Sequence, residues 1–307
     1  MKKTEIVYPS FTKKALTFTI DDGNMKYDAK LLEILKPAGI KGTFNLCSDI
    51  HCGREREAYD FYQGYEIANH CKFHPIINYD GVEYVISDEP FDEAAADFNK
   101  IYKVDGREGF FWFHKPNAWR HMVFEADFLT YIKEGKRELE QIFGVGKVKD
   151  FVWPYGDQNN AAAHELIKNT HRSSRITGCT GDTTGFAIPS DKYAWSYNAN
   201  DDNLLEIMEK YESCPDDGEL KFFAFGVHSI DFESSGRWGV LERFAEKYGY
   251  RPDTYWYASV GEIFDYEEAA KSLDISGEKI INRSDIRIYL KLDGARVIIE
   301  PHSEITV

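Results

Sequence analysis

The sequence predicts an α/β fold built as a (β/α) barrel, followed by a small β appendage. The chain opens with a strand, a helix and a second strand, at a spacing that implies parallel strands and a right-handed crossover. Helix and strand signals then continue to alternate, which favours the barrel. Two alternating apolar runs near the end, 286–292 and 296–300, are joined through Asp293 and Gly294, and this pattern predicts a β-hairpin.

Local periodicity places the individual elements. A β-prone apolar run over 15–20 ends at Asp21, and leucines at helical spacing over 27–35 are closed by Pro37 and Gly39. Short apolar runs predict further strands over 42–46, 65–69, 148–154, 220–227 and 256–260. Helical spacing predicts further helices over 131–143, 161–168, 204–211 and 262–270.

The length of the chain and the pattern of its apolar residues indicate how it is divided into domains. A chain of 307 residues, 43% of them hydrophobic, can bury the core of one large barrel domain. We expect this domain over 1–273, with an insertion at about 76–135 where the pattern loosens, and the appendage over 274–307. Aromatic residues in the insertion favour core packing but also fit a platform on which sugars stack. These residues are Phe110, Phe111, Trp112, Phe113 and Trp119.

Charge and cysteine usage argue against several classes of protein. The formal net charge of −15 disfavours binding to nucleic acids and to anionic membranes, so we expect a substrate that is neutral, cationic or held by one local site. No apolar run is long enough for a membrane span and no apolar signal segment follows the basic start, which predicts a cytoplasmic protein, although a trimmed secreted form would look the same. The five cysteines form no CxxC pair, which predicts reduced thiols.

Polar residues end four of the predicted strands, where parallel α/β folds collect their functional groups. The first are Asp21 and Asp22, whose side chains would point to opposite faces of an ideal strand. Gly23 permits a bend through which they converge, and two close carboxylates need a cation or a proton between them. A solvated turn is the alternative interpretation.

His70 and His74 follow the third predicted strand, four residues apart. On a helical turn this spacing would put both imidazoles on one face, suited to a divalent metal ion, although Pro75 places the pair at the end of a turn. Two surface histidines at this spacing by chance are the alternative. Two histidines and one carboxylate form a recurrent metal site, so Asp22 is the natural third ligand and Asp21 is left to act on water.

Tyr155 and His228 complete the set of strand-end residues. Tyr155 lies in a Pro-Tyr-Gly turn that can present a backbone N–H to an oxyanion, or that is simply a turn. His228 ends a buried run, where a histidine held in the core is the usual reading. The four features in this order favour one functional site over four unrelated structural ones.

Together these segments resemble the polysaccharide deacetylase superfamily (NodB homology, carbohydrate esterase family 4) over about residues 12–265. Residues 19–23 are similar to its T-F-D-D-G motif, with isoleucine in place of phenylalanine. Residues 64–75 resemble its G-H-E-I-G-N-H-[ST]-x-x-H-P segment. Residues 152–156 and 227–228 resemble its R-x-P-Y-G and late L-x-H motifs.

The resemblance implies a fold, an activity and a cofactor. The fold is a distorted (β/α)7 barrel of the NodB type with the site at its top. The activity is hydrolysis of acetyl groups from an N-acetylated or O-acetylated oligosaccharide or polysaccharide. The implied cofactor is one divalent metal ion, Zn²⁺ or a similar ion such as Co²⁺, Ni²⁺ or Mn²⁺, with Asp22, His70 and His74 as its ligands.

The resemblance also implies the catalytic roles. Asp21 would be the general base, Tyr155 would supply an oxyanion-hole N–H, and His228 would be the general acid. Val152 stands where the family has an arginine that holds the catalytic aspartate, and Arg172 or Arg175 would have to replace it. The family's Asp-Trp motif, which orients the late histidine, has no clear match. Candidates for that aspartate are Asp191, Asp201 and Asp202.

Three functions follow from these observations. A metal-dependent carbohydrate deacetylase is the leading hypothesis. The missing arginine motivates a second, a catalytically impaired relative that only binds carbohydrate. The third is an amidase acting on a non-sugar C–N bond, as in metal-free branches of the superfamily. It is weakened because this chain keeps the implied ligands Asp22, His70 and His74.

Overall fold

The structure is a computed structural model that describes residues 3–77, 85–87, 92–95, 100–103, 110–115, 118–276 and 278–306. The chain divides into two compact units. Unit 1 comprises residues 1–44 and 178–307, and unit 2 comprises residues 45–177.

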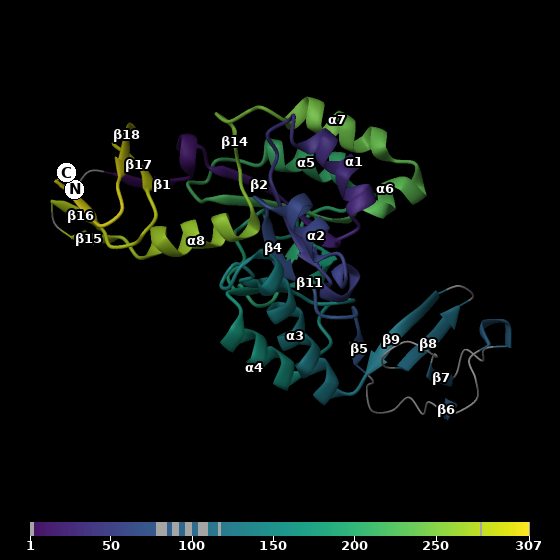
Figure 1. Ribbon diagram of the computed structural model, residues 1–307. Coiled ribbons are helices and arrows are strands. Elements are labelled where there is room, and N and C mark those ends of the chain that lie inside the picture. Colours follow the sequence, from purple (N-terminus) through teal and green to yellow (C-terminus); the bar gives the residue numbers. More distant parts are fainter. Residues whose placement is uncertain are drawn as a thin grey trace. The chain divides into compact units, whose positions relative to one another are not determined.

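Unit 1 contains three parallel strands, β2 (Lys14–Asp22), β13 (Lys221–His228) and β14 (Tyr255–Tyr257), with β2 in the middle. Every β2 residue from Ala15 to Asp21 is buried, because helices and strands cover both faces. Burial on both faces explains why apolar residues do not alternate with charged ones between Ala15 and Ile20. The register pairs His228 with Asp21, so both strands end at the same edge (Figure 1).

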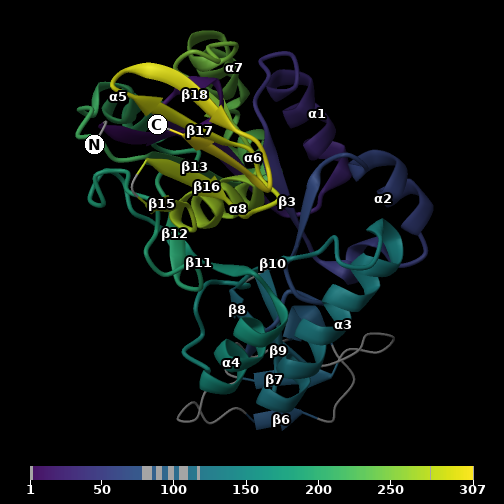
Figure 2. The same ribbon diagram turned by 90° about the vertical axis from the view of Figure 1, so that its left-hand side faces the viewer.

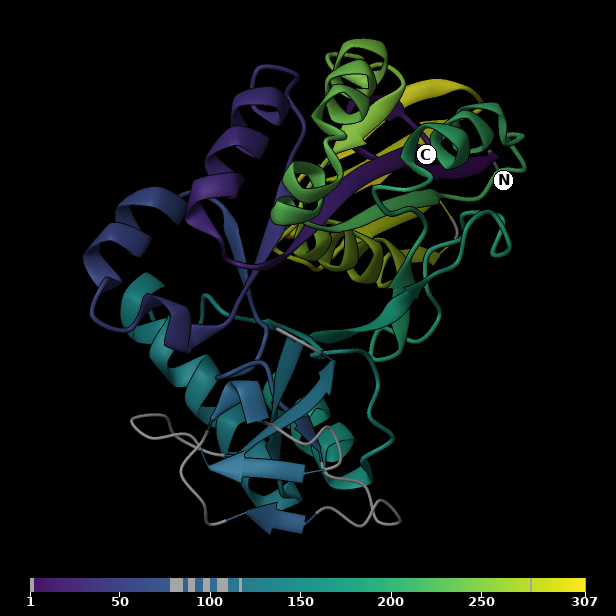
Figure 3. The same cartoon turned by 90° about the vertical axis from the view of Figure 1, so that its right-hand side faces the viewer.

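Helices cover the faces of these strands. In Figure 3, α1 (Met25–Leu35), α6 (Ser229–Ser235) and α7 (Trp238–Tyr248) lie on one side of β2 and β13, and α8 (Val260–Lys271) lies on the other. A fifth helix, α5 (Leu204–Ser213), contacts α7 and β13. Ser259 and Glu262 form a capping box at the start of α8, which fixes where that helix begins.

The C-terminal part of unit 1 confirms the predicted hairpin. Strands β17 (Ile288–Leu292) and β18 (Ala295–Ile299) pair in antiparallel fashion, and β1 (Thr4–Val7) from the chain start pairs with β17 (Figures 1 and 2). A second small sheet has the order β15 (Asp274–Ser276), β16 (Lys279–Asn282), β19 (Ser303–Thr306). Isoleucine and leucine side chains of β16, β17 and β18 belong to the buried cluster that also contains α8.

Unit 2 contains parallel strands β4 (Glu66–Asn69), β10 (Asp150–Val152) and β11 (Ser173–Cys179). Its helices are α2 (Glu55–Tyr62), α3 (Glu125–Phe143) and α4 (Ala161–Thr170). Short 3₁₀ turns are η2 (Ser48–His51) and η3 (Glu93–Ala95) in unit 2 and η1 (Pro9–Phe11) in unit 1.

Two strands of the barrel, β3 (Gly42–Leu46) and β11, each contain residues of both units. With β12 (Trp195–Tyr197), the strand order is β12-β11-β10-β4-β3-β2-β13, which confirms the predicted distorted (β/α) barrel.

The region predicted as an insertion contains a five-stranded sheet in unit 2. Its order is β5 (Ile76–Ile77), β9 (Ala118–Val123), β8 (Phe110–Lys115), β7 (Lys100–Lys103), β6 (Val85–Ser87) (Figures 1 and 2). Phe111 is buried, as core packing predicts, and the side chains of the other four aromatic residues lie outside those described. The domain boundary at 273/274 stays a prediction.

Two further expectations concern the whole sequence. None of the five cysteines forms a disulfide bond in the structure, and the prediction of reduced thiols stays a prediction. Among the residues that the structure describes, no helix has the length and apolar character needed to cross a membrane.

Candidate functional site

In unit 1, Asp21 and Asp22 are the last residues of β2. Asp21 is buried, with 8% of its surface exposed, and Asp22 is half-buried. Asp22 has φ +76° and Gly23 has φ +82°, so the predicted bend begins one residue earlier than Gly23, at a residue with a side chain. An aspartate in this left-handed region costs about 1 kcal/mol, a strain that folds tend to retain at functional positions.

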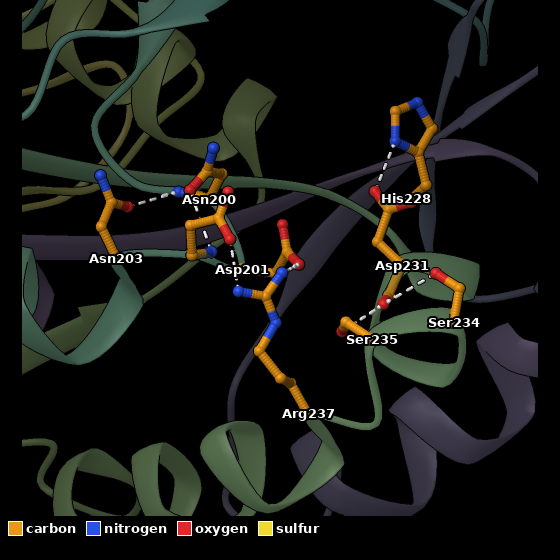
Figure 4. Close-up of polar contacts among 9 residues, drawn as sticks. Asn200, Asp201, Asn203, His228, Asp231, Ser234, Ser235 and Arg237 are labelled. Carbon is orange, nitrogen blue, oxygen red and sulfur yellow. Dashed lines mark hydrogen bonds and ion pairs between the residues drawn. The ribbon is translucent and has the colours of Figure 1, made fainter.

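His228, at the end of β13, lies beside these carboxylates. Its Nε2 is 3.9 Å from Oδ2 of Asp22, and its Nδ1 is 2.9 Å from Oδ2 of Asp231 in the first turn of α6 (Figure 4). The carboxylate of Asp231 can only accept, so His228 donates its Nδ1–H and keeps Nε2 toward Asp22. The imidazole is therefore held in one orientation.

The surroundings of His228 favour its charged form. Burial lowers the pKa of His228, but the hydrogen bond to Asp231 and the negative charges of Asp21, Asp22 and Asp231 outweigh burial and raise the pKa to about 9. The imidazole thus carries a proton at neutral pH. A protonated histidine at a strand end is suited to donate a proton.

Asp231 is the functional residue that sequence reasoning missed. Two of the three predicted partners of His228, Asp201 and Asp202, instead form ion pairs with Arg237 (Figure 4), and Asp191 accepts the backbone N–H of Tyr193. The hydroxyls of Ser234 and Ser235 donate to the carbonyl of Asp231. The available signal was local: an aspartate three residues after a histidine, where a strand passes directly into a helix.

In unit 2, His70 and His74 lie together. Their Nε2 atoms are 3.1 Å apart. His70 donates its Nδ1–H to the carbonyl oxygen of Val152 at 2.9 Å, so its Nε2 carries no hydrogen, which is the tautomer that a metal ligand has. The spacing alone is that of a helical turn, but the backbone between the histidines is not helical. His74 has φ +46°, and Cys71 and Phe73 also have left-handed backbones.

A set of hydrogen bonds holds this turn. Asn69 accepts the backbone N–H of Cys71 through Oδ1 and donates through Nδ2 to the carbonyl of Ile132 in α3. Asp49 accepts the N–H of Phe73 at 2.7 Å. Gly135 of α3 leaves the space that the turn needs, because a Cβ there would lie 2.6 Å from Oδ1 of Asn69.

Tyr155 lies next to His74, with the two ring centroids 4.4 Å apart. Tyr155 has φ +56° and is 38% exposed. Gln158, a buried residue that the motifs do not include, donates to the carbonyls of Pro75 and Pro154 and so joins the two turns.

The structure also separates the two candidate arginines. Arg172 forms ion pairs with Asp150 and, at 3.7 Å, with Glu66, so it is engaged at the other end of the strands. Arg175 is buried and lies directly opposite Val152 in the β10–β11 register. Arg175 is therefore a better candidate than Arg172 to replace the arginine that is absent at position 152.

The histidine pair fits a metal ion. Two nitrogen ligands of a tetrahedral Zn²⁺ at about 2.0–2.1 Å lie about 3.3 Å from each other, close to the 3.1 Å observed. The fixed tautomer of His70 is the one that a ligand requires. Nitrogen donors of this kind suit Zn²⁺ and neighbouring transition ions.

Carboxylates and imidazoles stand at the carboxyl ends of parallel strands, which is where α/β barrels carry their active sites. The chain belongs to the polysaccharide deacetylase family, because the family model "Polysaccharide deacetylase" matches residues 9–173. No curated protein matches the chain.

Solved structures show a low level of likeness. The peptidoglycan deacetylase PdaC from Bacillus subtilis is 13% identical, with 85% of this chain and 94% of that chain covered and a TM-score of 0.46. The family 4 carbohydrate esterase from Streptomyces lividans in complex with acetate is 16% identical, with 76% and 88% covered and a TM-score of 0.42. A BA3943 mutant, a CE4 family pseudoenzyme with restored enzymatic activity, is 13% identical, with 81% and 67% covered and a TM-score of 0.46. At these scores the family assignment rests on the family model alone.

Proposed function

We propose that this chain is a metal-dependent hydrolase that removes acetyl groups from N-acetylated, or O-acetylated, carbohydrate. Membership of the deacetylase family supports the reaction class. The observation that carries the metal dependence is the His70–His74 pair, with its Nε2 atoms 3.1 Å apart and the His70 tautomer fixed by Val152.

Asp22 completes the proposed ligand set with His70 and His74. A carboxylate with two imidazoles leaves coordination positions open for water and substrate. A divalent ion bound there supplies Lewis-acid polarisation of the acetyl carbonyl and acidifies water. The left-handed backbones of Asp22 and His74 support this assignment, because such strain concentrates at ligand-holding positions.

The remaining roles belong to residues around the acetyl group. Asp21 accepts a proton from the attacking water, and the backbone N–H of Tyr155 donates to the oxyanion that forms. His228, held protonated by Asp231, gives its proton to the leaving amine. Water and the acetamide thereby become acetate and a free amine. We assign to Arg175, which lies opposite Val152 in the β10–β11 register, the part of the arginine absent at position 152.

Acetate release tests this function. Purified protein loaded with Zn²⁺ or Co²⁺ is incubated with acetylated chitooligosaccharides, peptidoglycan fragments and acetyl-xylan, before and after treatment with a chelator. We expect acetate from at least one substrate, lost on chelation and restored by metal. Metal binding without acetate from any substrate would support the carbohydrate-binding relative, and a chain that binds no metal would support the amidase.

A further inference from the structure

In unit 2, Arg120 lies near the proposed metal ligand His74. It lies on β9, and its Cζ is 4.1 Å from the centroid of the Tyr155 ring, which in turn contacts His74. The strand register gives the same placement independently. Ile76 pairs with Met122 in parallel, so β9, which carries Arg120, runs beside the segment that follows His74.

Arg120 is a half-buried residue. Within the described part of the chain, no carboxylate forms an ion pair with Arg120, whereas Arg54 and Arg56 of the same unit pair with Glu57 and Asp60. Stacking on Tyr155 holds the guanidinium by its face. Its edge then keeps the N–H donors that bind a carboxylate in bidentate fashion.

The net charge of the protein bears on whether Arg120 could bind an anionic substrate. A net charge of −15 opposes the approach of anions, so an anionic substrate needs a local cation. Arg120 is one aromatic ring away from the proposed ligand His74. Because Arg120 and His74 both contact the Tyr155 ring, a substrate bound at His74 would pass close to Arg120.

We propose that Arg120 determines specificity by binding a carboxylate on the acetylated sugar or on its neighbour, so that the substrate class is an acidic acetylated glycan. This inference rests on the proposed function for its location. The carboxylate has two chemical sources: a lactyl ether beside an N-acetyl group, as in muramic acid, or a uronic acid beside an O-acetylated sugar.

Matched substrate pairs test the inference. Deacetylation is measured on an N-acetylmuramic acid oligomer and on an O-acetylated uronic acid oligomer, each next to its neutral methyl ester. We expect kcat/KM to favour the acid form of one of them by about tenfold or more, the worth of a charge-assisted contact. Arg120→Gln should abolish the preference, Arg120→Lys should retain part of it, and the pair that shows it identifies the source.

A binding measurement separates this inference from the proposed function. Calorimetry measures how tightly the deacetylated forms of these oligomers bind. The result therefore does not depend on whether the protein hydrolyses acetyl groups. Wild type should bind the acid forms about tenfold more tightly than Arg120→Gln. Arg56→Gln is the matched control, because Arg56 also lies over a tyrosine ring, at 5.8 Å, but pairs with Asp60. Equal binding by wild type and Arg120→Gln, or a preference of wild type for the neutral forms, would overturn the inference whether or not acetate is released.

Discussion

His228 in unit 1 and three buried histidines of unit 2 differ in their expected charge at neutral pH. In unit 1, Asp231 and the neighbouring aspartates raise the pKa of His228 to about 9 against the effect of its burial. In unit 2, burial lowers the pKa of His51 and of His121 to about 4, and that of His171 to about 3. The histidine beside carboxylates is thus charged at neutral pH, and the three whose pKa is lowered by burial are neutral.

The difference extends to the proposed metal ligands. His70 has a backbone carbonyl as its Nδ1 partner, whereas His228 has a carboxylate. A carbonyl fixes the tautomer without adding charge, which suits a neutral ligand. A carboxylate stabilises the imidazolium, which suits an acid. The following predictions test this division, from the largest expected effect to the smallest.

Replacing Asp21 by asparagine should produce the largest loss. Asparagine keeps the size of the side chain but cannot accept the proton of water, so acetate release should fall about 1000-fold while the metal content stays as in wild type. Acetate assays and elemental analysis of the same samples measure both. Asp253→Asn, an exposed position of unit 1, is the control. Activity within about tenfold of wild type would remove Asp21 from the reaction.

Asp231→Asn should lower kcat about tenfold on acetamides and less on activated esters, whose leaving groups need no proton. Losing the carboxylate lowers the pKa of His228, so the alkaline limb of the kcat profile should move to lower pH. Asp202→Asn, which contacts Arg237 rather than His228, is the control. An equal loss on amides and esters would show that Asp231 does not act through the proton of His228.

Gly135→Ala tests the support of the histidine turn in unit 2. The new Cβ would lie 2.6 Å from Oδ1 of Asn69 and 3.1 Å from the backbone of Lys72, so we expect a loss of about 2 kcal/mol in unfolding free energy. Weaker metal binding should accompany it. Gly239→Ala in α7 is the matched control, since its Cβ would meet nothing closer than 3.9 Å. Equal stability of the two variants would show that α3 and the turn do not pack this closely.

His121→Phe tests the neutral histidines through acid sensitivity. His121 stacks on Phe111, and its pKa of about 4 lies below the ordinary value of about 6.5. Between these values the unfolded chain binds a proton that the folded chain does not, so stability is lost as pH falls from about 6.5 to 4. The expected loss in unfolding free energy is about 2 kcal/mol at pH near 5, and His121→Phe should remove it. Denaturant unfolding at neutral pH and at pH near 5 measures the free energies of both proteins. A gain of the same size at neutral pH would contradict this cause.

Much of the fold could be predicted because its signals are local. The segments that form β2 and β13 are rich in apolar and β-prone residues, and the leucine spacing of α1 lies within one helix. The pairing of β1 with β17 could not be predicted, because it joins residues such as Thr4 and Leu292 that no local pattern connects.

The site shows the same limit. Its motif residues stand at strand ends that periodicity locates, but their partners depend on backbone turns that periodicity does not encode. The left-handed conformations of Asp22, His74 and Tyr155 override the helical and strand spacings from which the sequence is read. The aspartates predicted as partners of His228 lie far from it along the chain, whereas the aspartate that contacts it, Asp231, lies three residues away.

Metal analysis of purified protein tests the central claim most directly. Wild type should carry about one divalent ion per chain, and Asp22→Asn and His74→Ala should each lower this to less than about a tenth. His164→Ala, in α4 and paired with Asp157, should keep the ion. Metal-free wild type, or full occupancy in Asp22→Asn and His74→Ala, would contradict a shared site.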